Sequence, residues 1–308
     1  MQKRRTLMLT IGIAFAIAGL ISSAGAQQRF KTPDEAAEAL AAAARAGDSK
    51  GVIAVLGPDA IDIVSSGDAV ADENTRKEFV AAYDAKHSVA ADGNNPATLM
   101  LGPDNYPFPI PLVQKDGSWQ FDTKAGREEI LARRIGRNEL AAIQVCLAYY
   151  DAQNEYSEIT PKADGMAVYA WRIVSDPGKR DGLYWPRTQG EPDSPIGEAV
   201  AAATQKGYRA GTGAAFHGYR YKILTRQGSA APGGELDYIV DGKMIGGFAL
   251  VAYPAEYGNS GITTFIINHK GDVFQKDFGE NTKQVASRMK SFNPDHTWKK
   301  VAEAEEKK

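Results

Sequence analysis

One loop in this chain of 308 residues combines side chains that suit ligand recognition. The stretch GKRDGLYWPRTQG contains Lys179, Arg180, Tyr184, Trp185 and Arg187. Tyrosine and tryptophan offer flat apolar area at a low cost in conformational entropy, and the cations add charged hydrogen-bond donors. These five residues are therefore predicted to contact a carbohydrate or a peptide, without covalent chemistry because no nucleophile accompanies them. The alternative is that Tyr-Trp-Pro plugs the core beneath the loop, since large aromatic side chains are usually buried.

The histidines do not indicate a particular reaction. The turn from Asn268 to Gly271 is expected to join two strands, with His269 exposed at the tip of this hairpin. A catalytic histidine needs a carboxylate or a nucleophile within hydrogen-bond reach, and the sequence provides neither at such a turn. The chain has four histidines, and their spacing does not match a zinc site. We therefore predict no catalytic residue, no metal and no cofactor.

The N-terminus has the pattern of a secretory signal peptide. Lys3, Arg4 and Arg5 precede an apolar run from Leu7 to Ile21, and the small residues Ala24-Gly25-Ala26 follow. We expect cleavage after the last of these, with an uncleaved anchor as the alternative. No other segment approaches the roughly 18 apolar residues that a membrane span needs, so no stable span is expected in the mature chain. The pattern predicts a periplasmic or secreted protein.

Charge and cysteine content narrow the class of protein further. Removing residues 1–26 takes away three basic residues and no acidic one, so the formal net charge moves from −2 to −5. A mildly acidic surface argues against a nucleic-acid partner. The single cysteine, Cys146, lies in the apolar run LAAIQVCLAYY, so no disulfide can form within the chain and stability must come from a packed core. We expect this cysteine to be buried and inert.

Helices followed by strands are predicted for residues 27–122. Thr32 and Glu35 form a capping box at the start of an alanine-rich helix, a short helix follows, and ENTRKEFVAAYDAKH gives a third. ATLMLG and IPLVQKDGSWQFD have strand patterns, and Asp116-Gly117 is a hairpin turn within the second. This order of elements resembles the cystatin-like roll of the nuclear-transport-factor superfamily, which implies an N-terminal lobe of that shape.

A long helix is predicted for residues 126–158, which contain no proline. The helix is apolar on nearly every face between Leu140 and Tyr150, as expected of a helix at the centre of a lobe. Leu140, Ile143, Leu147 and Tyr150 have the spacing of one helical face. We predict that this stripe packs against the sheet that follows.

The predicted fold class is α+β, with two lobes. The first covers residues 27–122, and the second, residues 123–300, consists of the long helix packed on an antiparallel sheet. Residues 175–217 are expected to be irregular, and residues 301–308 form a charged tail. The predicted strands of the second lobe are GYRYKILT, LDYIV, MIGGFALVAYP, ITTFIIN and DVFQKDF.

The second lobe contains three long segments, SDPGKRDGLYWP, HGYRYKILTRQGSAAPGG and DGKMIGGFALVAYPAEYGNSGITTFIINHKGDVFQKDFG. They resemble the bacterial exported family catalogued as domain of unknown function 2950. The similarity covers most of residues 175–280 and extends more loosely over the mature chain. The family has no assigned activity, so this resemblance implies an exported envelope protein and no particular chemistry.

A second set of residues follows the order found in the globular domains of type IV pilin-like proteins. The set comprises Gly218-Tyr219-Arg220-Tyr221, Ala252-Tyr253-Pro254, Gly258, Gly261, Phe265 and Gly271-Asp272-Val273. The C-terminal half is thus similar to these domains, in which a long helix precedes a sheet. Pilins begin with an apolar, membrane-inserting half-helix, whereas Arg133, Arg134 and Arg137 stand at this position here. The resemblance therefore does not extend to pilus assembly.

Together these features predict a non-catalytic binding or scaffold module of the cell envelope. Its partner would be an envelope protein or a glycan, and the sequence specifies neither the ligand nor the oligomeric state. The alternative is an envelope hydrolase with an unrecognised site around His217 and Asp237. A deep cleft with a histidine and a carboxylate within hydrogen-bond reach would favour the hydrolase, and a shallow aromatic groove would favour the binding module.

Overall fold

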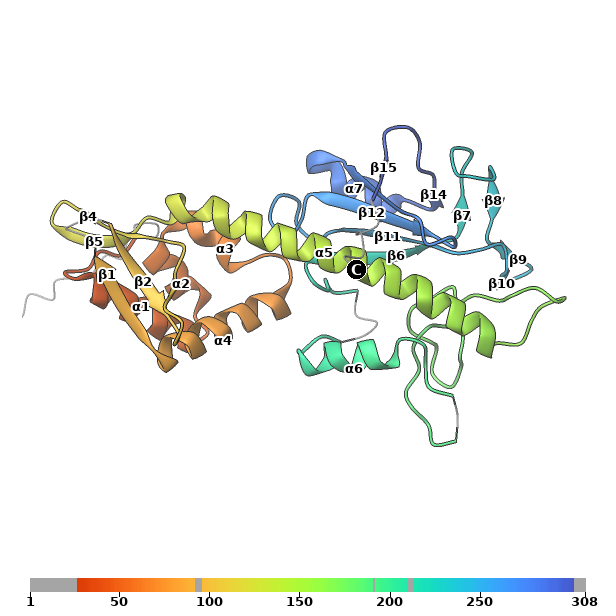
Figure 1. Ribbon diagram of the computed structural model, residues 1–308, viewed down its shortest axis with the longest axis horizontal. Coiled ribbons are helices and arrows are strands. Elements are labelled where there is room, and N and C mark those ends of the chain that lie inside the picture. The colour runs from red at the N-terminus through yellow and green to blue at the C-terminus, as the bar shows by residue number, and fades with distance from the viewer. Residues whose placement is uncertain (1–26, 92–95, 191, 210–212, 302–308) are drawn as a thin grey trace, which may run out of the picture.

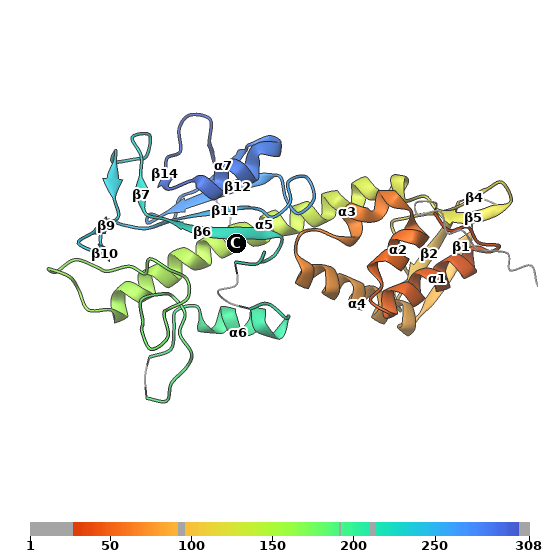
Figure 2. The ribbon, with the colours of Figure 1, turned by 180° about the vertical axis from the view of Figure 1, so that it is seen from behind.

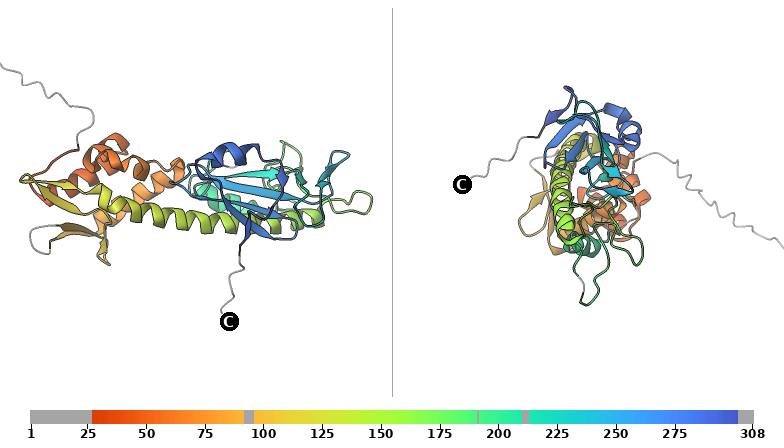
Figure 3. Two further views of the ribbon diagram at one scale, coloured as in Figure 1. Left: turned by 90° about the horizontal axis from the view of Figure 1, so that it is seen from above. Right: turned by 90° about the vertical axis from the view of Figure 1, so that its right-hand side faces the viewer.

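The computed structural model describes residues 27–91, 96–190, 192–209 and 213–301. The molecule is elongated, and one helix, α5 (Thr123–Ile159), runs along both of its lobes (Figures 1 and 3). Helices and antiparallel sheets occupy separate stretches of each lobe, so the predicted α+β class is confirmed. The predicted signal peptide, and the charged tail beyond residue 301, lie outside the described residues.

Helices begin the N-terminal lobe. Thr32 caps the first one as predicted, because its hydroxyl oxygen accepts a hydrogen bond of 3.1 Å from the backbone N–H of Glu35. The predicted third helix is the longest of the group and begins earlier, after an Asp68 cap. The helices are α1 (Pro33–Arg45), α2 (Ser49–Leu56), α3 (Ile61–Val64) and α4 (Ala69–Ala85), with the 3-10 turn η1 (Pro58–Ala60) before α3.

An antiparallel sheet completes this lobe, and α1, α2 and α4 lie against it (Figure 2). Its strands are β1 (His87–Ala91), β2 (Ala97–Leu101), β3 (Tyr106–Pro107), β4 (Leu112–Lys115) and β5 (Ser118–Phe121), in the order β1-β2-β4-β5 with β3 paired to β2. Asp116 and Gly117 both have positive φ, the geometry of the predicted two-residue hairpin turn. The likeness to a cystatin-like roll stays a prediction.

The first turns of α5 pack on the N-terminal lobe. The hydroxyl of Thr123 donates a hydrogen bond of 2.6 Å to the carbonyl of Leu56. Gly126 lies so close to the segment before β4 that a Cβ at this position would be 2.5 Å from the carbonyl oxygen of Pro109. Leu131 is also buried. The predicted lobe boundary before Thr123 stays a prediction, and α5 contacts both lobes.

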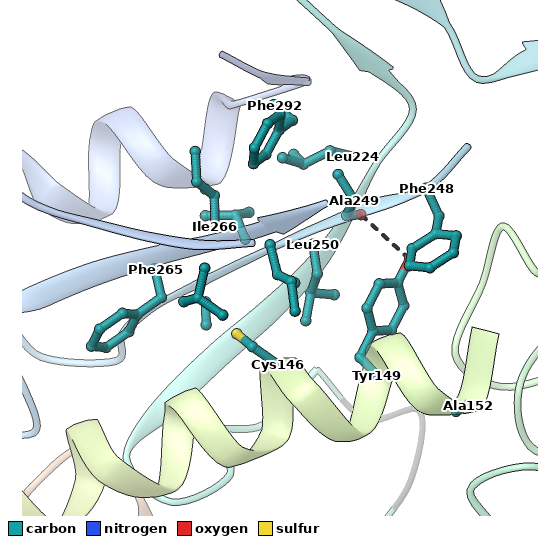
Figure 4. Packing of buried hydrophobic residues seen from close by; sticks show 14 of the residues in the cluster. Cys146, Tyr149, Ala152, Leu224, Phe248, Ala249, Leu250, Phe265, Ile266 and Phe292 are labelled. Atoms are coloured by element: carbon teal, nitrogen blue, oxygen red, sulfur yellow. Dashed lines mark hydrogen bonds between the residues drawn. The ribbon is translucent and has the colours of Figure 1, made fainter. Parts of the chain in front are cut away.

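The C-terminal lobe is built on a five-stranded antiparallel sheet in the order β15-β13-β12-β11-β6. Its strands are β6 (Tyr219–Leu224), β11 (Ala249–Pro254), β12 (Thr263–Asn268), β13 (Val273–Asp277) and β15 (Lys299–Lys300). Helix α5 covers one face, while α7 (Thr282–Arg288) and β14 (Ser291–Phe292) lie on the other (Figure 4). The smaller elements are β7 (Arg226–Gln227), β8 (Leu236–Asp237), β9 (Ile239–Val240), β10 (Lys243–Met244) and η2 (Gly279–Asn281).

The face of α5 that packs on this sheet differs from the predicted one. Leu140 is 68% exposed, so its predicted place in the core was wrong. The other members of the predicted stripe are half-buried at the margin of the core. The buried residues of this half of the helix are Ala142, Cys146, Tyr149, Ala152, Gln153 and Tyr156. Several of these residues are small or polar, so a prediction of the buried face that counts only large apolar residues does not identify them.

Small side chains let α5 approach the strands closely. Cys146 and Tyr149 point from α5 toward the face of the sheet on which Leu250 lies (Figure 4). Burial raises the pKa of the Cys146 thiol to about 12, so the prediction of a buried cysteine is confirmed. The phenol of Tyr149 donates a long hydrogen bond of 3.4 Å to the carbonyl of Ala249.

The hairpin of β12 and β13 forms as predicted, but its histidine is not at an exposed tip. The His269 ring is half-buried and lies edge-on to the rings of Tyr238 and Phe248, at centroid distances of 6.0 and 6.3 Å. Its Nδ1 is enclosed and has no partner among the described residues, and burial lowers the pKa of the ring. Tyr238 precedes β9 and Gly247 follows β10, and a Cβ at Gly247 would lie 2.7 Å from the imidazole Nδ1. The expected exposure was therefore wrong.

Candidate apolar binding cavity

The aromatic centre of the predicted binding loop belongs to the core. Trp185 is 5% exposed, its ring lies edge-on to Tyr156, and its Nε1–H donates a hydrogen bond of 3.1 Å to the carbonyl of Pro192. Tyr184 is fixed through its backbone N–H, which donates to the carbonyl of Ile173 at 2.8 Å. The indole therefore plugs the core, as the alternative interpretation of the loop proposed.

The cations of the loop lie beside the acidic residues around it. The Lys179 ammonium is 3.2 Å from Asp176, and the Arg187 guanidinium is 3.0 Å from Asp193, all at exposed positions. The Arg180 guanidinium lies 5.8 Å from the centre of the Trp185 ring. Exposed ion pairs contribute little to stability, so Lys179 and Arg187 are accessible to a partner at small cost. Ligand contact by this loop stays a prediction.

The residues suggested for a hydrolytic site are not brought together. His217 precedes β6, whereas Asp237 lies in β8 and pairs with Arg226 of β7, which follows β6. A strand rises about 3.3 Å per residue, so β6 separates them by on the order of 20 Å. Burial lowers the pKa of His217, Lys206 adds to this effect, and the carboxylate that opposes it is Asp68 rather than Asp237. The proposed pair was wrong.

A cavity of about 250 Å³ lies between α5, α6 (Gly197–Gln205), the edge strand β6 and the loops that join them. Most of its lining is apolar or aromatic: Val145 and Tyr149 of α5, Leu183 of the loop, Val200 and Ala203 of α6, and Tyr221 of β6. Among the described residues of the lining, Arg209 is the only charged one. Ligand sites are typically concave and largely apolar with few polar groups, and this cavity has that character.

Helix α6 roofs the cavity without being buried itself. Its sequence, GEAVAAATQ, is rich in alanine, the best helix former, and Glu198 in the first turn favours the N-terminal end of the helix dipole. Ile196, Ala199, Val200 and Ala203 recur at the spacing of one helical face, and all four line the cavity. No residue of α6 is buried, although this face is apolar. The helix therefore presents an apolar face to space that the described chain does not fill.

Hydrogen bonds join the C-terminal end of α6 to the N-terminal lobe. The side-chain amide of Asn74 donates a hydrogen bond of 3.1 Å to the carbonyl of Lys206. The Tyr208 hydroxyl donates at 2.9 Å to Asp68, which is 2% exposed and also accepts from the backbone N–H of Gly218 at 2.9 Å. Burial, together with this carboxylate, raises the pKa of Tyr208. Tyr208 also lines the cavity, so one side chain takes part both in the cavity wall and in the contact between the lobes.

A second contact between the lobes involves Arg134 of α5. Its guanidinium donates hydrogen bonds of 2.6 Å to the carbonyl of Asp62 and 2.5 Å to the side-chain oxygen of Asn259. Asn259 in turn donates at 2.8 Å to the carbonyl of Ser65. These bonds join α3 and Ser65, which follows it, in the first lobe to the β11–β12 loop of the second.

The sequence contained one signal for the cavity that the prediction of an irregular stretch over residues 175–217 did not use. The spacing of residues 196, 199, 200 and 203, within an alanine-rich run, is that of a short amphipathic helix. Its position over β6 depends on contacts between segments far apart in the chain. That position had no sequence signal.

The described part of the chain has neither a metal-ligand cluster nor a helix suited to a membrane. There, no three or more His, Cys, Asp or Glu side chains are grouped so as to hold a metal ion. Among the same residues, no helix has both the length and the apolar character that crossing a bilayer requires.

Comparison with known proteins places the chain in a family. Searches of curated proteins and of solved structures gave no significant match. Residues 27–301 match the family model described as "Protein of unknown function (DUF2950)". The match spans the N-terminal lobe, α5, the roof helix and the C-terminal sheet. The chain therefore belongs to the DUF2950 family, to which the segments within residues 175–280 had pointed.

Proposed function

We propose that this protein is a non-catalytic binding module whose cavity beneath α6 takes a small apolar ligand. The observation that supports this most directly is the space of about 250 Å³ under an apolar helix face. Apolar cavities that water does not fill can bind apolar molecules, as a cavity of roughly 150 Å³ binds benzene. The space here is larger and has an apolar lining from several elements, so a ligand gains contacts on several sides.

The proposal is tested by filling the cavity from its roof. Ala203 lines the cavity and Ala202, its neighbour on α6, is exposed and does not. Ala203→Trp and the matched control Ala202→Trp add the same indole to two different faces of one helix, about 100° apart. Binding of the neutral fluorescent probe N-phenylnaphthylamine is measured by titration, and folding of each variant by circular dichroism.

The unaltered protein and Ala202→Trp are expected to bind the probe with equal affinity. Ala203→Trp should bind it at least about tenfold more weakly, a loss of about 1.4 kcal/mol of binding free energy. No binding by the unaltered protein would refute the proposal. Equal binding by the two variants would place the probe elsewhere and would also refute it.

The proposal includes a location in the bacterial cell envelope, periplasmic or secreted. It is supported by the basic residues, apolar run and small residues that precede Gln27. Intact mass of the protein recovered from the producing cells tests it, with a mature chain that begins at Gln27 as the expected result. A membrane-bound chain that retains residues 1–26 would contradict this part of the proposal.

A partner is assigned to the 179–187 loop in the same proposal. Lys179 and Arg187 are exposed, each forms a surface ion pair, and Trp185 is buried in the core beneath them. A rigid loop with accessible cations suits an acidic envelope protein or an anionic glycan. Loss of co-purification when both cations are replaced by glutamine, with the stability unchanged, is the expected result. Retention of the partner would remove this loop from the proposal.

A further inference from the structure

Strand β1 forms an open edge of the N-terminal sheet. It stands at the end of the strand order β1-β2-β4-β5, and its strand partner among the described residues is β2 alone. All of its residues are exposed except Val89, which is half-buried. The side of β1 away from β2 is therefore accessible to another chain.

The register shows which backbone groups lie at this edge. The N–H of Gly102 donates a hydrogen bond of 2.8 Å to the carbonyl of Lys86, so these two residues form a hydrogen-bonded pair at the end of the β1–β2 ladder. Such pairs alternate along an antiparallel strand, so Ser88 and Ala90 also bond to β2. The residues between them, whose N–H and C=O groups point away from β2 and have no backbone partner in the described part of the chain, are His87, Val89 and Ala91.

Other sheet edges of the protein are covered or charged. Beyond β5, Phe30 pairs with Trp119 through backbone hydrogen bonds of 2.9 and 2.8 Å. The edges of the C-terminal sheet carry cations, because β15 consists of two lysines and β6 contains Arg220 and Lys222. Covering segments and charged side chains are usual devices that keep a sheet edge from pairing with another chain. The sequence of β1, HSVAA, contains no proline and no acidic residue, lysine or arginine, so this edge lacks them.

A second copy of β1, placed antiparallel, satisfies every backbone group at the edge. When Val89 stands opposite the partner's Val89, His87 stands opposite the partner's Ala91, and the reverse pair follows from symmetry. All three residues direct their groups outward, so each pair forms the two hydrogen bonds of an antiparallel ladder. A surface that binds its own copy in this way gives a twofold-symmetric contact, the commonest arrangement among soluble oligomers.

The side chains also fit an identical copy in this register. Val89 packs beside the helical core, and the two valines would meet at the centre, where a β-branched pair stabilises a sheet. On the other face, Ser88 stands opposite the partner's Ala90, and both side chains are small and exposed. The two copies of Lys86, the residue before the strand, are six positions apart along the ladder, or about 20 Å. Their repulsion is screened at this distance, so no like charges oppose the pairing.

We propose that the protein forms a symmetric dimer in which the β1 strands of two copies pair antiparallel about Val89 and join the two N-terminal sheets into one. This inference goes beyond the proposed function, because β1 contributes no residue to the described lining of the cavity. Two strands of five residues cover little area, and interfaces below about 1,200 Å² are typical of weak complexes. The dissociation constant of the dimer is therefore expected to be on the order of 10–100 μM.

Sedimentation velocity from about 1 μM to about 1 mM measures this dissociation constant. Hydrogen exchange read out by nuclear magnetic resonance then locates the contact. The amides of His87, Val89 and Ala91 should exchange rapidly in the monomer and about tenfold more slowly when about nine-tenths of the chains are paired, since only the free chain exchanges. The amides of Ser88 and Ala90, which bond to β2, are the internal control and should be protected at every concentration.

Two matched double variants test the register. Ser88→Lys with Ala90→Lys places lysine opposite lysine at two points of the interface, whereas Ser88→Lys with Ala90→Glu places lysine opposite glutamate at the same points. Both positions are exposed, so both variants are expected to fold, which circular dichroism checks. The first variant should have a dissociation constant at least about tenfold higher than the second, and added salt should reduce the difference.

Three results would overturn the inference. A protein that stays monomeric up to about 1 mM does not pair through β1, even if the strand captures a different protein. Equal dissociation constants for the two double variants would place the dimer contact elsewhere. Slow exchange of the three edge amides in the monomer would show that another part of the chain already covers the edge. The cavity is tested separately, because Ala203→Trp should dimerise like the unaltered protein while it loses the naphthylamine probe.

Discussion

Removing the carboxylate of Asp68 tests whether one buried side chain holds the two lobes together. Its Oδ2 accepts from the Tyr208 hydroxyl and the Gly218 N–H, each at 2.9 Å, and its Oδ1 accepts from the N–H of Ala71 at 3.0 Å. Two of these donors belong to the C-terminal lobe, and the third is the first turn of α4. Asp68→Ala therefore removes a helix cap and a junction contact in one step.

The expected cost follows from these three bonds. Loss of the cap of α4 lowers the free energy of unfolding by about 1 kcal/mol. A buried donor left without an acceptor costs about 1–3 kcal/mol, and this applies to the Gly218 N–H and, more mildly, to the Tyr208 hydroxyl, which can rotate toward another acceptor. Asp68→Ala should therefore destabilise the protein by about 3–5 kcal/mol. Asp68→Asn keeps one acceptor oxygen and should cost about 1–2 kcal/mol.

Urea unfolding followed by circular dichroism and by tryptophan fluorescence measures these values. A double-mutant cycle with Tyr208→Phe isolates the bond between the two side chains, since only coupled residues give a non-additive result. Loss of less than about 1 kcal/mol in Asp68→Ala would refute the reasoning, because it is no more than the cap alone accounts for. Strict additivity with Tyr208→Phe would show that the two groups do not interact.

Three further predictions concern the core, α5 and pH. Trp185→Ala should lower the free energy of unfolding by about 3–5 kcal/mol, the usual range for emptying a buried aromatic site, and a change below about 0.5 kcal/mol in urea unfolding would instead put the indole at the surface. Gly126→Ala should destabilise the protein by at least about 1 kcal/mol, because its Cβ would lie 2.5 Å from the Pro109 carbonyl oxygen. A Cβ at Gly136 in the same helix would meet nothing within 4 Å, so Gly136→Ala should stabilise the protein by about 0.5–1 kcal/mol. Equal effects of the two variants in thermal melts would contradict the packing of α5 on the first lobe. Burial lowers the pKa of His269 in the folded protein, so the unfolded chain binds more protons as the pH falls. The stability that the neutral ring contributes is therefore present above about pH 6.5 and is lost below it. Urea midpoints measured across this range should fall less in His269→Gln than in the unaltered protein. An equal fall in both would argue that the ring is solvated.

Local chemistry explains which elements could be predicted. The Thr32 cap, the Asp116-Gly117 turn and the proline-free helix α5 each depend on residues close together in the chain. Such features are readable from sequence because their geometry is set within a few residues. The same holds for the β12–β13 hairpin, whose pairing joins Ile267 to Val273 across a short turn.

Long-range packing explains what could not be predicted. The face of α5 that meets the sheet is set by how closely the strands approach, so Ala142 and Cys146 are buried while the larger Leu140 is exposed. His269 sits at a turn, where side chains are usually solvated, but the rings of Tyr238 and Phe248 pack against it. In each case the neighbour that decides burial is distant in sequence.

Composition alone gave an incomplete picture of the candidate site. Tyrosine, tryptophan and cations in the 179–187 loop have the chemistry of a binding surface, yet burial of Trp185 follows from its place beside Tyr156 at the end of α5. The cavity, by contrast, has little distinctive composition. It arises because α6, held at its C-terminal end by Asn74 and Tyr208, lies over the sheet without reaching it.

Tyr208 gives the cavity and the lobe junction a common element. Its ring lines the cavity and its hydroxyl bonds to Asp68 across the junction. A ligand that packs on the ring therefore has different contacts when the junction is closed and when it is open, and only such a difference couples binding to conformation. Coupling of this kind is reciprocal, so we expect Asp68→Ala to weaken binding of the naphthylamine probe as well as stability. Unchanged affinity in the folded variant would show that the ring keeps its place without the carboxylate, and that the cavity and the junction are independent.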